Sequence, residues 1–108
     1  MPLFKTKREV FNWIKTGQKT IDIRKGEAWK RDTAVVQCGL DLLRLPITKK
    51  ETGKLTELVR QDNYKTIIPT ATSLEKALEY LRQFYGETDG AFTAYHLSCD
   101  SDEHLNSE

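Results

Sequence analysis

Apolar side chains recur along the chain at two kinds of spacing. Intervals of three and four residues predict helices, and alternation every second residue predicts strands. The helical spacing occurs in residues 7–16 and again in residues 73–85. A Thr-x-x-Glu capping box opens each of these segments, and Gly17 or Gly86 follows it. The second segment has the clearer apolar face, which carries Leu74, Ala77, Leu78, Leu81 and Tyr85.

Runs of β-branched and alternating apolar residues predict the strands. In residues 20–24, Ile21 and Ile23 point to one face and the polar residues to the other. Proline has no amide donor for a sheet ladder, so we expect Pro46 to mark a sheet edge or a β-bulge. The other predicted strands cover residues 3–5, 33–38, 42–48 and 91–97.

The remaining segments link these elements and set the fold class. We expect a solvated turn at residues 49–53, a short helix at 55–59 and irregular chain at 64–69. The order lacks alternating βαβ units, which disfavours a doubly wound parallel sheet. The pattern instead predicts an α+β fold, a small β-barrel of mixed or antiparallel strands with about three short helices. We expect one domain over residues 1–98 and an acidic, disordered tail over 99–108.

Composition excludes several classes of protein. The 108 residues are 38% hydrophobic and 31% charged, with a mean hydropathy of −0.60, which is typical of a soluble globular domain. No apolar run approaches the roughly 20 residues of a membrane helix, and no signal peptide is evident, so we expect a cytoplasmic protein.

The two cysteines, Cys38 and Cys99, are far apart in the sequence, and we expect both to be reduced thiols. A catalytic pairing of Cys99 with His96 or His104 has no local signature. No zinc-ligand spacing occurs, so neither a metal nor a cofactor is expected.

Charge is distributed unevenly along the chain. Residues 1–54 hold 13 Lys and Arg against 6 Asp and Glu, a net +7, whereas residues 55–108 hold 4 against 10, a net −6. A basic half favours anionic partners such as a phosphate backbone. The two halves could equally interleave in space and cancel one another, and the sequence leaves both interpretations open.

One segment, residues 17–24, gathers the candidate chemistry. Gly17 allows a sharp turn that places Lys19 at the mouth of the following strand. Asp22 and Arg24 share one strand face, and the carboxylate would orient the guanidinium while leaving donors free for a phosphate, a carboxylate or a base edge. The alternative is a surface turn followed by a solvent-facing ion pair, which would contribute little stability.

This segment, Gly-Gln-Lys-Thr-Ile-Asp-Ile-Arg, resembles the GxKxxExR motif of ASCH domains in the PUA-like superfamily, with Asp22 where the family usually has Glu. The similarity covers roughly residues 3–98. It extends to the preceding Phe-Asn-Trp-Ile-Lys-Thr-Gly helix, to the Tyr-Lys-Thr-Ile-Ile-Pro and Ser-Leu-Glu-Lys-Ala-Leu segments, and to the last strand. Residues 30–32 depart from the family because the Gly-Asp turn of many members is Lys-Arg-Asp here.

The resemblance implies a PUA-like β-barrel with a cleft around the motif, and a domain that binds RNA or a nucleotide-like ligand. Trp29 lies in a basic loop and could stack on a base or only pack; Tyr64, beside Lys65, could line the cleft. We expect a monomer, with no membrane contact. The candidate ligand- or RNA-binding residues are Gly17, Lys19, Thr20, Asp22, Arg24, Trp29 and Tyr64.

Two other functions remain open. In one small stand-alone enzyme of this family the motif lysine acts with a strand threonine and a glutamate. Here Asp22 occupies the threonine position and no acid lies between Asp62 and Glu75, so the resemblance does not carry that activity over. The alternative is nevertheless a small hydrolase, either an amidohydrolase on a modified nucleoside or a ribonuclease, with Lys19 and Asp22 as catalytic residues. A third possibility is a protein partner bound by the acidic second half.

Overall fold

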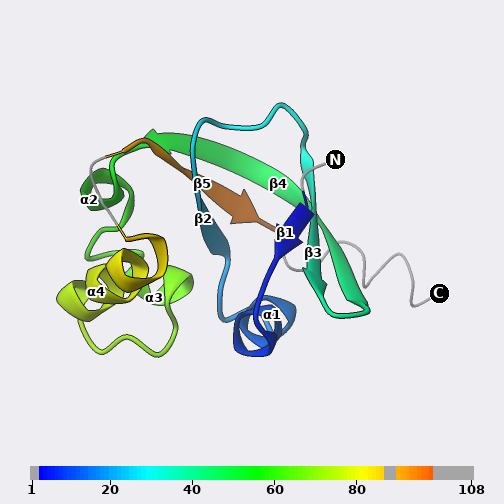
Figure 1. Cartoon of the computed structure of the whole chain (residues 1–108), viewed down its shortest axis with the longest axis horizontal. Helices are drawn as coiled ribbons and strands as arrows, with labels where there is room; N and C mark the ends of the chain where they lie inside the picture. Colours follow the sequence, from blue (N-terminus) through cyan, green and yellow to red (C-terminus); the bar gives the residue numbers. More distant parts are fainter. Residues whose placement is uncertain (1–2, 87–89, 99–108) are drawn as a thin grey trace.

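The computed structural model describes residues 3–86 and 90–98. Five strands form one sheet in the order β1-β3-β4-β5-β2. In Figure 1, α2, α3 and α4 gather at one end of the sheet, and α1 lies apart from them. The elements are β1 (Leu3–Lys5), α1 (Arg8–Lys15), β2 (Ile21–Lys25), β3 (Thr33–Cys38), β4 (Asp41–Gly53), α2 (Leu55–Leu58), α3 (Tyr64–Ile67), α4 (Leu74–Tyr85) and β5 (Phe92–Leu97).

The sheet curls because its longest strand, β4, changes partner along its length. The first half of β4 pairs antiparallel with β3, and the second half pairs antiparallel with β5. The register shifts between Ile47 and Lys49, next to Pro46. Of the two alternatives for Pro46, a sheet edge or a β-bulge, this irregularity beside it favours the bulge. β1 pairs with β3 alone, in parallel, and β2 pairs with β5 alone, so these two strands end the sheet.

The predicted α+β class is confirmed, but two linking segments were assigned wrongly. The turn expected at residues 49–53 is the second half of β4, held by pairing with β5 and by the contact of Thr52 Oγ1 with Thr93 Oγ1 at 3.2 Å. Residues 64–69 contain one helical turn, α3, so the described chain has four helices rather than three. The first error arises because pairing with β5 outweighs local polarity. The second concerns a helical turn whose carbonyls at Thr66 and Ile67 accept from Thr20 and Lys19, contacts between segments far apart in sequence. The tail proposed for residues 99–108 lies outside the described residues.

The helix ends also differ from the predicted caps. Thr6 Oγ1 donates to Gln37 O at 3.2 Å, between β1 and β3, and α1 begins after Lys7 without a side-chain cap. The N-cap of α4 is Ser73, whose Oγ accepts from the amide of Lys76 at 3.2 Å. Gly86 ends α4 in the left-handed conformation, as the sequence predicts.

The buried side chains form two clusters on either side of the curled sheet. One cluster packs the sheet against α2, α3 and α4, and includes Leu55, Ile67, Ala77 and Phe92. The other lies under α1, around Phe4, Phe11, Ile14, Val36 and Tyr95. Among the described residues, no helix is long and apolar enough to cross a membrane.

A matched pair of leucine truncations tests this core. Leu55 is fully buried, whereas Leu40 is 99% exposed. Leu55→Ala should lower the free energy of unfolding by about 2–5 kcal/mol because it leaves a cavity. Leu40→Ala should change it by less than about 0.5 kcal/mol. Urea denaturation of both variants measures the difference, and equal losses would contradict the assignment of this core.

Candidate functional site

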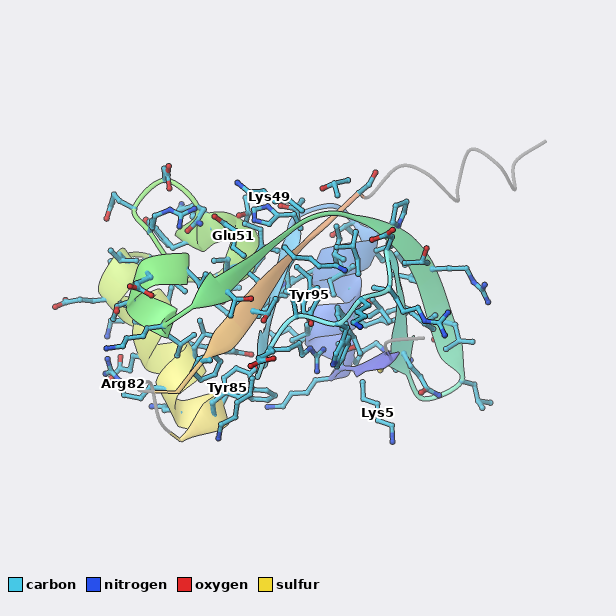
Figure 2. All side chains as sticks on the ribbon, turned by 90° about the horizontal axis from the view of Figure 1, so that it is seen from above. Lys5, Lys49, Glu51, Arg82, Tyr85 and Tyr95 are labelled. Carbon is cyan, nitrogen blue, oxygen red and sulfur yellow. The ribbon has the colours of Figure 1, made fainter. Side chains whose placement is uncertain are left out.

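A cavity of about 320 Å³ opens between β2, the segment that joins β1 to α1, and α4. It lies where the sheet fails to close, because β1 and β2 are its two end strands. Lys5 and Tyr85, which both line it, lie along the same side of the molecule in Figure 2, with Lys49 and Glu51 on the opposite side. The lining residues are Lys5, Thr6, Lys7, Val10, Trp13, Lys19, Asp22, Ile23, Arg24, Ile68, Tyr80, Leu81, Phe84 and Tyr85.

Lys19 is a buried cation in the wall of this cavity, with 4% of its surface exposed. Gly17, at φ 85°, lets the chain turn sharply after α1 so that the lysine enters the interior. Its Nζ donates to Ile21 O at 2.8 Å and to Ile67 O at 2.6 Å, and lies 3.7 Å from Asp22 Oδ1. Two carbonyl acceptors and one carboxylate therefore surround the ammonium group. Burial lowers the pKa of Lys19 to about 8.

Asp22 and Arg24 form the polar centre of the site. Arg24 Nε donates to Asp22 Oδ2 at 2.6 Å, and Asp22 is only 5% exposed. The guanidinium carbon of Arg24 also lies 4.5 Å from the ring centroid of Phe4, on β1. The alternative of a solvent-facing ion pair is therefore wrong. Among the described residues, nothing further pairs with the two Nη nitrogens of Arg24, which leaves them available to a ligand.

Aromatic side chains of α4 form much of the remaining wall. Tyr80 packs against Trp13 with ring centroids 6.4 Å apart, and Phe84 meets Tyr85 edge-on at 5.0 Å. The Tyr85 hydroxyl donates to Ile23 O, and burial raises the pKa of this tyrosine. These rings create an apolar enclosure beside the polar centre.

The mouth of the cavity is basic. Lys5 and Lys7 are exposed, and Lys7 Nζ lies 5.6 Å from the ring centroid of Phe84, which is itself 54% exposed. Of the charged lining residues, four are cationic and one, Asp22, is anionic. The cavity therefore suits a ligand with a flat apolar part and a negative charge.

Three of the seven predicted site residues, Lys19, Asp22 and Arg24, line this cavity. Gly17 forms the turn before it, and Thr20 is held through its backbone, donating to Thr66 O at 2.9 Å. Trp29 is 39% exposed and lies 5.2 Å from Phe4 and 5.4 Å from Tyr95, ring to ring, outside the cavity lining. Tyr64 packs against the buried cluster between the sheet and the helices α2, α3 and α4.

Sequence reasoning missed the contribution of α4 and of Lys5 and Lys7, at the end of β1 and just after it. Tyr85 lies in the predicted apolar face of the helix over residues 73–85. A tyrosine at such a position indicates a buried hydrogen bond, because a buried hydroxyl needs a partner. Lys5 and Lys7 carried no signal beyond their charge. Among the described residues no group of three or more His, Cys, Asp or Glu could hold a metal ion.

The titration of Lys19 gives a test of its burial. Its pKa is about 8 in the folded state, against 10.5 for a free lysine side chain. Between these values the unfolded chain binds more protons, so this group should make stability rise with pH from about 8 toward 10.5. The free energy of unfolding of the wild type, minus that of Lys19→Met, should therefore increase over this range. The control Lys65→Met replaces an exposed lysine and measures the effect of removing a surface lysine by the same substitution. A constant difference for Lys19→Met would contradict a lowered pKa.

No protein-family model matches the chain, and no curated protein does. Solved structures do match it. Hypothetical protein PH0355 is 17% identical with a TM-score of 0.73, over 89% of this chain and 95% of that one. Protein PF0455 from Pyrococcus furiosus is 16% identical with a TM-score of 0.66, over 90% and 94%. A mutant of the ASCH protein from Zymomonas mobilis is 12% identical with a TM-score of 0.65, over 98% and 79%. The chain therefore has the ASCH-type fold, a small α+β domain built on one curled sheet.

Proposed function

We propose that the chain binds an RNA nucleotide, or a nucleotide-like ligand, in this cavity. The observation that carries the proposal is the convergence of Lys19, Asp22 and Arg24 on one cavity that also has aromatic walls. The base would enter the cavity, and the phosphate would remain at the mouth beside Lys5 and Lys7.

The lining supports this orientation of the ligand. A base has two π faces and polar edges, so it suits an enclosure of aromatic and aliphatic side chains with a few fixed polar groups. The contacts to the π faces of the base would come from four aromatic rings, those of Trp13, Tyr80, Phe84 and Tyr85. The hydrogen bonds to the polar edge of the base would come from the Nη nitrogens of Arg24, because its Nε already donates to Asp22. The exposed lysines at the mouth then match the charge of the phosphate.

The geometry favours binding over hydrolysis. A catalytic lysine needs a free lone pair directed at its substrate. The Nζ of Lys19 faces Ile21 O, Ile67 O and Asp22 Oδ1, so its protons are directed into the protein. We therefore assign Lys19 a positioning role, in which it braces β2 and the carboxylate that orients Arg24.

Arg24→Lys tests the polar centre. It keeps a cation beside the buried Asp22, whereas Arg24→Ala would leave that carboxylate short of a partner and destabilise the fold. An ammonium cannot reproduce the planar fork, so binding of UMP should weaken by roughly 1.5–3 kcal/mol. Isothermal titration measures the affinity, and a thermal melt confirms folding. Unchanged affinity in a folded variant would remove Arg24 from the site.

Lys5→Ala and Lys7→Ala test where the phosphates lie. Each should weaken binding of a short single-stranded RNA irrespective of its sequence, and should reduce the salt dependence of log Kd by about one. Lys65→Ala is the matched control, since Lys65 is exposed but does not line the cavity. Equal effects of all three substitutions would indicate attraction by net charge alone. If no nucleotide or RNA shifts the NMR signals of the cavity residues at low salt, the proposed function is wrong.

A further inference from the structure

The free edge of β2 presents its backbone to the cavity side of the sheet. β2 pairs with β5 alone. The amide of Leu97 donates to Thr20 O at 2.8 Å, and the amide of Gly26 donates to Ala91 O at 2.8 Å. Residues of an antiparallel strand alternate between facing their partner strand and facing away from it. The N–H and C=O groups of Ile21 and Ile23 therefore point away from β5.

The Ile21 and Ile23 carbonyls on this edge each already accept a hydrogen bond. Ile21 O accepts from Lys19 Nζ at 2.8 Å, and Ile23 O accepts from the Tyr85 hydroxyl. The Ile23 N–H comes between these two carbonyls along the strand, and no group among the described residues accepts from it. Ile23 is 2% exposed and lines the cavity. A buried N–H without an acceptor is rare and unfavourable, so this group is a built-in donor for a ligand.

We propose that the Ile23 N–H recognises an oxygen acceptor on the bound base, so that the site selects bases with a carbonyl group over bases with an amino group at that position. This inference rests on the proposed function and specifies its ligand. Tyr85 is the specificity-determining residue, because its hydroxyl occupies the neighbouring carbonyl and leaves the edge with a donor alone.

The surrounding groups reinforce this selection. The Nη nitrogens of Arg24 are donors only, and the Asp22 carboxylate is directed at Arg24 and Lys19. An amino group placed here would meet donors, and the buried Ile23 N–H would stay unpaired. A site built to hydrogen-bond one group rejects the analogue that lacks it, because its own polar groups then lose their partner.

Inosine and adenosine monophosphates form the probe pair, since they share ring size and phosphate and differ at position 6, oxo against amino, and at N1, which carries a proton only in IMP. IMP should bind roughly 3–10-fold more tightly than AMP, the scale of one hydrogen bond. In an amide NMR titration with IMP, the Ile23 proton should move downfield and its exchange with solvent should slow. UMP also carries carbonyl groups and should give the same response if the cavity admits only pyrimidines.

Tyr85→Phe then tests the role of the hydroxyl. Without it Ile23 O becomes a free acceptor beside the N–H, a pair that complements the amino group and ring nitrogen of adenine. The preference for IMP over AMP should fall to about one or reverse. Tyr64→Phe is the control, because Tyr64 lies outside the cavity lining and its hydroxyl bonds to no described residue.

The outcomes separate the two proposals. If nucleotides shift other cavity signals but the Ile23 amide neither moves nor gains protection, this inference is wrong and the proposed function stands. If the Tyr85→Phe variant folds and its preference for IMP over AMP is unchanged, this inference is likewise wrong and the proposed function stands. If Tyr85→Phe does not fold, the wild-type amide measurement decides. If no nucleotide shifts any cavity signal, the proposed function fails and this inference fails with it.

Discussion

The buried ammonium of Lys19 joins the parts of the molecule on which the cavity depends. Its Nζ contacts β2 through Ile21 O, α3 through Ile67 O, and the Asp22 carboxylate. A lysine cannot be buried as a cation without such partners, since desolvation disfavours the charged form. The three acceptors offset part of that cost, and in doing so they fix α3 against the edge of the sheet. Asp22 in turn fixes Arg24, so the orientation of the guanidinium is set from inside the core.

The incomplete closure of the sheet explains why a cavity exists at all. No backbone ladder joins β1 to β2; in its place, Arg24 on β2 stacks over Phe4 on β1. A side-chain bridge of this kind holds two strands near one another without filling the space beside them. The α4 helix covers that space from outside, and Tyr85 ties it to β2. The same hydroxyl and the Lys19 ammonium occupy the carbonyls of an edge strand, which would otherwise be open to pairing with another chain.

The excess of basic residues in the first half of the chain is reflected in the lining of the cavity. Every cation in the cavity lining comes from the first half of the chain, whereas the second half supplies aromatic rings through α4. Some other charges of the first half pair within it or with the second half. Arg8 lies 2.9 Å from Asp41, and Glu51, on the side opposite Lys5 and Tyr85 in Figure 2, lies 3.7 Å from Arg60. Charges of the two halves therefore do meet in space, and an anionic partner for the basic cavity mouth stays a prediction.

The sequence by itself determined the elements whose signal is local. Apolar spacing located α1 and α4, alternation located β2 and β5, and the glycine and charge pattern of residues 17–24 identified Lys19, Asp22 and Arg24 as a group. Tertiary structure decided the rest. Residues 49–53 are charged and look like a turn, yet they form a strand because β5 pairs with them. Strand order made β2 an end strand, and only that order turned the Ile23 N–H into a donor facing the cavity. Tyr85 lies 62 residues from Ile23 along the chain, and a contact across such a distance has no periodic signature in sequence.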